Sequence, residues 1–195
     1  MAYLDETTLE TLNFKSLGLN VKISDKASIY GSERISLGNN VRIDDFCILS
    51  AGDGGIELGN YIHIAAYCSL IGKALIKMED FSGLSSKVAI YSSSDDYSGN
   101  FLTNPTVPQQ FTNVVNGPVI LRKHVIIGVF ACILPNVEIG AGSAVGSYSL
   151  VTKNIEPGVI VSGVPARFLK KRSGKIFELE QAFLQSENLH TQHIL

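Results

Sequence analysis

The sequence has no excess of charge of either sign, no long apolar run and few cysteines. Its 195 residues carry 16 Lys and Arg against 18 Asp and Glu, a formal net charge of −2. The longest basic cluster, RFLKKR at residues 167–172, is too short for the basic patch that nucleic-acid binding requires. No apolar stretch approaches the roughly 20 residues of a membrane span. We therefore expect neither a nucleic-acid partner nor a membrane.

The cysteines also indicate a compartment. Cys47, Cys68 and Cys132 lie far apart and are odd in number, which fits free thiols in a reducing environment. The acidic stretch MAYLDETTLETLNF at the N-terminus lacks the charged-then-apolar pattern of a signal peptide. We expect a soluble cytoplasmic protein with one well-buried domain.

A period of six residues runs through most of the chain. From residue 121 the units read LRKHVI, IGVFAC, ILPNVE, IGAGSA, VGSYSL and VTKNIE. Each begins with an aliphatic residue: Leu121, Ile127, Ile133, Ile139, Val145 and Val151. The position four residues later is small or β-branched: Val125, Ala131, Val137, Ser143, Ser149 and Ile155. This period fits neither a helix nor an alternating strand, and predicts an all-β solenoid, a parallel β-helix of stacked coils.

The first half of the chain keeps the same rule with slips. The phase jumps near residues 35–37, 51–57 and 76–78, and such insertions belong on the turns of a solenoid. Cys47 and Cys68 fall on small interior positions, so we interpret them as core residues.

Both ends of the chain depart from the repeat. We expect an N-terminal cap or short helix at residues 1–18, the β-helix at 19–172, and a C-terminal helix and tail at 173–195. Apolar residues of the last segment fall on one helical face: Ile176, Leu179, Phe183 and Leu184. Because the ends of a solenoid need covering, we expect both terminal segments to do this.

The stretch IGAGSAVGSYSLVTKNIEPGVIVSGVPARFLKK, residues 139–171, resembles the closing coil and exit of the hexapeptide-repeat acyltransferases. The resemblance extends from about residue 20 to residue 172 and implies a left-handed β-helix. It is nearest to sugar acetyltransferases, including galactoside and maltose O-acetyltransferases and sugar-nucleotide N-acyltransferases of surface-glycan pathways. Members are usually homotrimers with active sites between subunits, and we expect the same here.

The resemblance also implies acetyl-CoA or another acyl-CoA as co-substrate, and no metal. By this resemblance the pantetheine arm of coenzyme A would pass Gly128 and Ser147. The phosphates of coenzyme A would meet four residues near the exit of the coil: Thr152, Lys153, Arg167 and Lys170. Three of these are cations suited to a polyanionic nucleotide, although cations at an exit segment can also be merely solvated.

The stretch AIYSSSDDYSGNF, residues 89–101, interrupts the repeat. In the O-acetyltransferases a histidine of this region acts as general base, and the resemblance puts Asp95 in its place. A carboxylate with a pKa of about 3.9 is a weak base toward a sugar hydroxyl. It suits an amine better, because it can orient the nucleophile and stabilise the developing cation. We therefore expect Asp95 to be catalytic, the reaction to be N-acylation of an amino sugar, and that sugar to be nucleotide-linked.

An external loop at about residues 91–118 would form part of the acceptor pocket, because long loops on rigid scaffolds often carry function. The residues that we expect to bind the acceptor are Ser85, Ser86, Asp96 and Tyr97. Further aromatic residues available for stacking are Tyr91, Phe101 and Phe111.

Three alternatives stay open. The first is a sugar O-acetyltransferase of the galactoside or maltose type that uses Asp95 or a histidine from elsewhere. His63 and His124 lie near coil turns, and His190 and His193 lie in the tail; none is a convincing base. The second is a metal-dependent lyase, which needs three histidines around zinc. The third is a non-catalytic binding scaffold.

Overall fold

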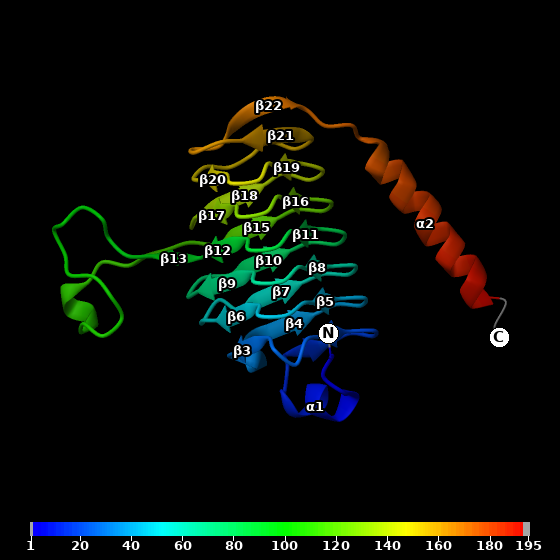
Figure 1. Ribbon diagram of the computed structural model, residues 1–195, viewed down its shortest axis with the longest axis horizontal. Coiled ribbons are helices and arrows are strands. Elements are labelled where there is room, and N and C mark those ends of the chain that lie inside the picture. The colour runs from blue at the N-terminus through cyan, green and yellow to red at the C-terminus, as the bar shows by residue number, and fades with distance from the viewer. Residues whose placement is uncertain (1, 193–195) are drawn as a thin grey trace.

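The computed structural model describes residues 2–192, and their side chains as far as Glu187. The chain forms a parallel β-solenoid in which short strands of successive coils stack into three long sheets (Figure 1). The fold class that the period of six predicted is thereby confirmed. The stack rises from the blue N-terminal strands to the orange C-terminal strands.

The three sheets form the walls of the solenoid. Sheet 1 contains β1 (Ser16–Leu17), β4 (Ile35–Leu37), β7 (Ile56–Leu58), β10 (Ile76–Met78), β15 (Val119–Leu121) and β18 (Val137–Ile139). Sheet 2 contains β2 (Lys22–Ile23), β5 (Arg42–Ile43), β8 (His63–Ile64), β11 (Gly83–Leu84), β16 (Ile126–Ile127), β19 (Ala144–Val145), β21 (Val159–Ser162) and β22 (Arg167–Lys171). Sheet 3 contains β3 (Ser28–Tyr30), β6 (Ile48–Ala51), β9 (Ser69–Gly72), β12 (Ala89–Tyr91), β17 (Cys132–Ile133) and β20 (Leu150–Val151).

The interior is a column of aliphatic side chains. Leu84 and Ile127, for example, are neighbours in sheet 2 and are 1 % and 0 % exposed. Every aliphatic lead position predicted after residue 120 is buried, and so are the positions four residues later except the last. That exception, Ile155, is only half-buried, because it lies in the closing coil and pairs through an isolated bridge with Ile139.

The phase slips lie on turns, and the one at residues 52–55 falls within the predicted range 51–57. The other two lie slightly before the predicted positions, because residues 35–37 and 76–78 are the strands β4 and β10 themselves. Their additional residues are in the turn with the 3-10 helix η1 (Ser32–Arg34) and in the segment 73–75. The coil therefore keeps its register while the turns absorb the insertions.

The external loop leaves the solenoid after β12. Its two legs, β13 (Ser93–Ser94) and β14 (Val115–Asn116), pair antiparallel, and the 3-10 helix η2 (Gln109–Phe111) lies beyond them. Figure 1 shows the loop projecting from one side of the stack.

The two terminal helices take different positions. Helix α1 (Glu6–Thr11) lies at the N-terminal end of the stack, where Leu9 is buried. Helix α2 (Lys175–Gln192) does not cover the other end as we expected, but runs alongside the solenoid (Figure 1). Its packed face is also shifted from the predicted one, because Leu179 is 56 % exposed while Glu180 is buried. Residues 193–195, including His193, lie outside the described residues.

None of the helices within residues 2–192 combines the length and the apolarity that crossing a membrane requires.

Candidate active site

Ser85, Gly128 and Ser147 lie along one edge of the solenoid, in the turns that join sheet 2 to sheet 3. The backbone N–H of Ser85 donates to the carbonyl of Ile127 at 2.9 Å, which places Ser85 beside Gly128 on the next coil. A Cβ on Gly128 would lie 2.6 Å from the backbone nitrogen of Ser147, so only glycine allows this close approach. We call these three residues the serine edge. It joins one predicted acceptor residue to both predicted pantetheine residues.

Buried thiols hydrogen-bond from the core to two of the turns between sheets 2 and 3, those of Ser85 and Ala65. Sγ of Cys68 donates to the carbonyl oxygen of Ser85 at 3.1 Å, and Sγ of Cys47 donates to that of Ala65 at 3.1 Å. The interaction with the neighbouring Cys47 thiol and burial raise the pKa of the Cys68 thiol, so it stays a protonated donor. Both cysteines are core residues, as predicted, at 0 % and 1 % exposure. The sequence pattern indicated their burial but not these bonds.

A cavity of about 440 Å³ opens beside the serine edge, on the outer face of sheet 2. We call it the serine cavity, and the lining residues that matter here are Tyr61, His63, Phe81, Gly83, Ser85 and Ser86. Space exists because Gly83 has no side chain. A Cβ there would meet only the carbonyl oxygen of His63 at 3.5 Å and Cδ1 of Ile126 at 3.7 Å. The volume lies in the range of about 300–1,000 Å³ that small-molecule sites occupy.

A buried carboxylate holds His63 in the wall of this cavity. Oδ2 of Asp44 lies 2.9 Å from Nε2 of His63, and Oδ1 of Asp44 accepts from Nε of Arg42 at 2.7 Å. Burial alone would raise the pKa of Asp44, but the hydrogen bonds and charges of His63 and Arg42 outweigh it and lower the pKa. An ionised carboxylate can only accept, so Nε2 of His63 carries a proton. His63 therefore has a fixed orientation, which sequence reasoning missed.

The coil repeat itself carries a signal for this pair. Arg42 and His63 are register partners in sheet 2, and so are Ile43 and Ile64. Aligning the coils by their aliphatic leads therefore places Arg42 opposite His63 and Asp44 diagonal to it, on the same outward face.

Helix α2 packs behind the aromatic wall of the serine cavity. The rings of Tyr61 and Phe81 are stacked, with centroids 4.7 Å apart and planes at 7°. Phe183 of α2 meets both edge-on, at 5.2 and 6.1 Å. The Tyr61 hydroxyl donates to Oε2 of Glu187 at 2.8 Å. The position of α2 thus bears on the shape of the cavity.

Glu180 is the polar centre of this contact. Its Oε1 lies 2.5 Å from Nζ of Lys123, and its Oε2 lies 2.7 Å from Nε2 of His124. Burial would raise the pKa of Glu180, but the hydrogen bonds and charges of Lys123 and His124 outweigh it and lower the pKa. His124 therefore docks the helix. Within residues 2–192, no group of three or more His, Cys, Asp or Glu side chains is arranged to hold a metal ion.

A second cavity of about 440 Å³, which we call the exit cavity, lies at the C-terminal end of the solenoid. Thr152, Lys153, Arg167 and Phe168 line it. Lys170 lies on the antiparallel strand β22 and is exposed, but does not line this cavity. No ion pair within the described part of the chain engages Lys153 or Arg167, although Nη1 of Arg167 donates to the carbonyl of Ala166 at 3.2 Å, so no carboxylate neutralises either charge.

The two adjacent aspartates of the external loop differ. Oδ1 of Asp96 accepts from the backbone N–H of Ser98 at 2.7 Å, and its Oδ2 accepts from Nδ2 of Asn113 at 2.9 Å. The Ser98 hydroxyl donates to the same Oδ1, and this bond, together with those from Asn113 and the Ser98 backbone, lowers the pKa of Asp96 and braces the loop. The carboxylate of half-buried Asp95 has no hydrogen-bond or ion-pair partner among the described side chains. Tyr97 is 92 % exposed.

One chain therefore brings the predicted residues into separate groups. The serine edge and serine cavity collect Ser85, Ser86, Gly128 and Ser147. The exit cavity collects Thr152, Lys153 and Arg167. The external loop carries Asp95, Asp96 and Tyr97, and none of these lines either cavity.

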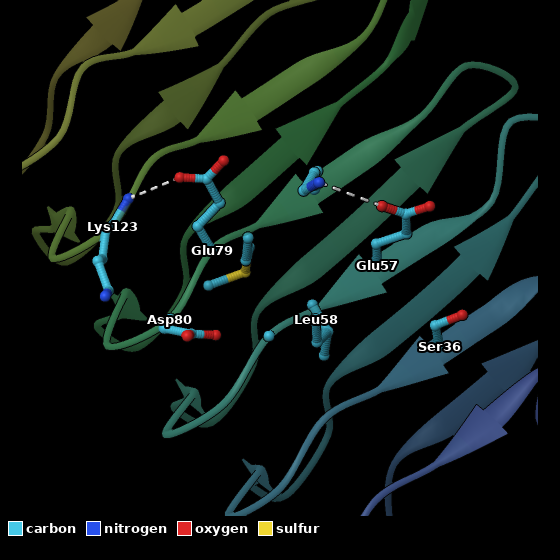
Figure 2. Close-up of a pocket in the computed structure, with 9 residues that line it drawn as sticks. Ser36, Glu57, Leu58, Glu79, Asp80 and Lys123 are labelled. Atoms are coloured by element: carbon cyan, nitrogen blue, oxygen red, sulfur yellow. Dashed lines mark hydrogen bonds and ion pairs between the residues drawn. The ribbon is translucent and has the colours of Figure 1, made fainter. Parts of the chain in front are cut away.

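A third cavity, of about 540 Å³, lies on the outer face of sheet 1 (Figure 2). Its charged groups are engaged within the protein: Nζ of Lys77 lies 3.6 Å from Oε2 of Glu57, and the backbone N–H of Lys123 donates to Glu79 at 3.2 Å. Asp80 likewise accepts from the backbone N–H of Asn60 at 2.7 Å. None of the predicted site residues lines this cavity, so we do not assign it to the reaction.

Comparisons with known proteins place the chain among acyltransferases. No family model matches it. It is 52 % identical, over 186 residues, to a dTDP-4-amino-4,6-dideoxy-D-glucose acyltransferase of Escherichia coli, covering 95 % of this chain and 97 % of the relative.

Solved structures agree. AntD, an N-acyltransferase of Bacillus cereus in complex with dTDP and 3-hydroxybutyryl-coenzyme A, superposes with a TM-score of 0.92 at 50 % identity, covering 95 % of this chain and 98 % of that one. An AntD variant in complex with dTDP-4-amino-4,6-dideoxyglucose and coenzyme A superposes with a TM-score of 0.92 at 49 % identity and the same coverage. A maltose O-acetyltransferase of Clostridium difficile, at 21 % identity and a TM-score of 0.58 over 86 % of this chain and 74 % of that one, shares the fold alone.

Proposed function

Because the chain belongs to the hexapeptide-repeat acyltransferases, we propose that it transfers an acyl group from acyl-coenzyme A to the amine of a nucleotide-linked amino sugar. The observation that carries this is the likeness, over 95 % of the chain, to an enzyme bound to a dTDP-linked amino sugar and coenzyme A. The acceptor is dTDP-4-amino-4,6-dideoxyglucose or a close analogue, and the donor is acetyl-CoA or a longer acyl-CoA.

Asp95 is the residue that contacts the reacting amine in this proposal. Among the described side chains its carboxylate has no partner, whereas the carboxylate of the neighbouring Asp96 is bonded within the loop. As the amine nitrogen attacks the thioester carbon, a C–N bond forms and the nitrogen gains positive charge, which a carboxylate stabilises. The C–S bond then breaks, and the proton from nitrogen passes to the leaving thiolate. Asp95 has to orient the amine and stabilise its charge, which needs little basicity.

Ser85 is the second residue that we place at the reaction. The solved AntD structures include variants of one aspartate and of a serine ten positions before it. Ser85 and Asp95 have this spacing, and so do Ser86 and Asp96. The first pair is favoured because the Asp96 carboxylate is used within the loop.

Coenzyme A binds along the serine edge and ends at the exit cavity. The pantetheine arm passes Gly128 and Ser147, where the absence of a side chain on Gly128 lets neighbouring backbone segments lie close together. The residues that meet the phosphates are Thr152, Lys153, Arg167 and Lys170. Charge-assisted hydrogen bonds from unpaired cations suit such a polyanion.

In this proposal the active site is completed in a homotrimer. Asp95 lines neither the serine cavity nor the exit cavity of its own chain, and the loop that carries it projects from the stack (Figure 1). A neighbouring chain in a trimer supplies the missing group.

The enzyme works in the cytoplasm in this proposal. The free thiols Cys47, Cys68 and Cys132 suit a reducing compartment.

The alternatives have no comparable support. Where the O-acetyltransferases carry their histidine base this chain has Asp95, and His124 is 10 % exposed and paired with Glu180 at the contact with α2. The relationship to AntD also argues against a lyase or a non-catalytic scaffold.

The test is release of thiol from acetyl-CoA with dTDP-4-amino-4,6-dideoxyglucose, beside dTDP-6-deoxyglucose, which carries a hydroxyl in place of the amine. We expect turnover with the amino sugar alone. Asp95→Asn should lose most of kcat, while Asp96→Asn, its matched control, should lose loop stability and little kcat. Turnover with the hydroxyl sugar, or equal losses in both variants, would overturn the proposal.

A further inference from the structure

We infer that the serine cavity receives the sugar of the acceptor, with His63 hydrogen-bonding to the ring substituents and Gly83 leaving room for the ring. The inference rests on the proposed function and deepens it. It assigns an acceptor subsite to the outer face of sheet 2, where it adds His63 and Gly83 to Ser85 and Ser86, which the sequence already indicated as acceptor residues.

The shape of the cavity depends on one missing side chain. His63, Gly83 and Ile126 are register neighbours across β8, β11 and β16, so their side chains point outward in one row. Gly83 leaves a gap in that row, and its φ lies outside the left-handed region. A glycine is therefore not needed there for the backbone. Its effect is to open space between an imidazole and an aliphatic side chain.

The chemistry of His63 suits a sugar. Nε2 donates to the ionised Asp44, which fixes the ring, and the second oxygen of Asp44 is fixed in turn by Arg42. The His63 side chain is 50 % exposed, so Nδ1 is available to a ligand. A histidine oriented by a carboxylate is pre-arranged to bind a hydroxyl or an amine through its other nitrogen.

The other walls complete a sugar site. The stacked rings of Tyr61 and Phe81 offer an apolar surface, and helix α2 supports them from behind. Ser85 and Ser86 add hydroxyls on the opposite side. Ligand sites commonly combine such apolar walls with a few placed polar groups.

Position along the serine edge links this subsite to the reaction. Ser85 lines the cavity and also lies beside Gly128, which the pantetheine arm passes in the proposed function. A sugar in the cavity would therefore lie next to the end of that arm, where the thioester is.

The test fills the cavity and removes the imidazole separately. Gly83→Val adds bulk to the gap with a residue that strands accept, and Ala144→Val places the same side chain on the same face of sheet 2, two strands away. His63→Ala removes the hydrogen-bonding group from a half-exposed position. KM for the dTDP-linked amino sugar, KM for acetyl-CoA and the melting temperature are measured for each trimeric enzyme.

We expect Gly83→Val to raise the acceptor KM roughly tenfold or more, and His63→Ala to raise it about 3- to 10-fold. The KM for acetyl-CoA and the behaviour of Ala144→Val should match the wild type. An unchanged acceptor KM in His63→Ala and Gly83→Val, with wild-type turnover intact, overturns the subsite and leaves the proposed function standing. Should Gly83→Val fail to fold, His63→Ala alone decides. A wild type without turnover on amino sugars overturns both.

Discussion

Removing the Glu180 carboxylate should release helix α2 from the solenoid. Glu180→Ala leaves Nε2 of His124 and Nζ of Lys123 without the oxygens that lie 2.7 and 2.5 Å from them. The side chain of His124 is only 10 % exposed and cannot regain full hydration in place, whereas that of Lys123 is 38 % exposed and can turn to solvent.

The magnitude follows from this difference in burial. Breaking a fully buried ion pair costs about 3–5 kcal/mol, and the exposure of Lys123 reduces this. We expect a loss of about 1–3 kcal/mol, the range for hydrogen bonds to charged groups and for a donor left unpaired. Alanine returns up to roughly 0.7 kcal/mol through its helix propensity.

Urea unfolding followed by circular dichroism measures the loss, since the chain has no tryptophan to report fluorescence. Limited proteolysis of α2 reports its detachment. Glu178→Ala, an exposed position of the same helix, is the matched control. A double-mutant cycle with His124→Ala should give a coupling energy of about 1 kcal/mol or more. Equal stability of Glu180→Ala and Glu178→Ala, or no coupling to His124, would refute this account of the contact.

Three further predictions concern pH, the donor site and the core. Because the folded-state pKa of Glu180 is lowered, the carboxylate stabilises the docked helix above the ordinary carboxyl pKa, and this stabilisation is lost as pH falls through the lowered value. Proteolysis of α2 should therefore rise only in that acid range. Glu180→Gln should abolish this pH dependence. Arg167→Ala should raise the KM for acetyl-CoA about tenfold, less at high salt, while Lys22→Ala at the other end of the solenoid changes nothing. Leu84→Ala, at a site 1 % exposed, should cost about 2–5 kcal/mol in urea unfolding.

Much of the fold could be predicted because the core repeats. Aliphatic leads such as Ile127 and Ile133 recur every six residues, and each is buried by the same geometry. A break in such a pattern is visible, which is why the external loop and Asp95 could be singled out. Aligning whole coils also brings Asp44 and His63 to neighbouring coils at sheet 2. Comparing single units of six residues does not show such contacts, because the two residues lie one full coil apart.

The position of α2 could not be predicted in this way. Glu180 pairs with His124, 56 residues away, and no period relates a terminal helix to the coil against which it packs. The surface that α2 packs against is mixed. Phe183, on the predicted apolar face, meets the rings of Tyr61 and Phe81, whereas Lys123 and His124 pair with Glu180. The packed face therefore includes an acid that an apolar pattern does not indicate, and Leu179 faces solvent.

The acyl group should end on nitrogen. Mass spectrometry tests this on the product formed from acetyl-CoA and dTDP-4-amino-4,6-dideoxyglucose, before and after treatment with mildly alkaline hydroxylamine, which cleaves oxygen esters and spares amides. We expect one added acetyl group that survives the treatment. An acetyl group removed by hydroxylamine would show transfer to a hydroxyl and would overturn the assignment to nitrogen.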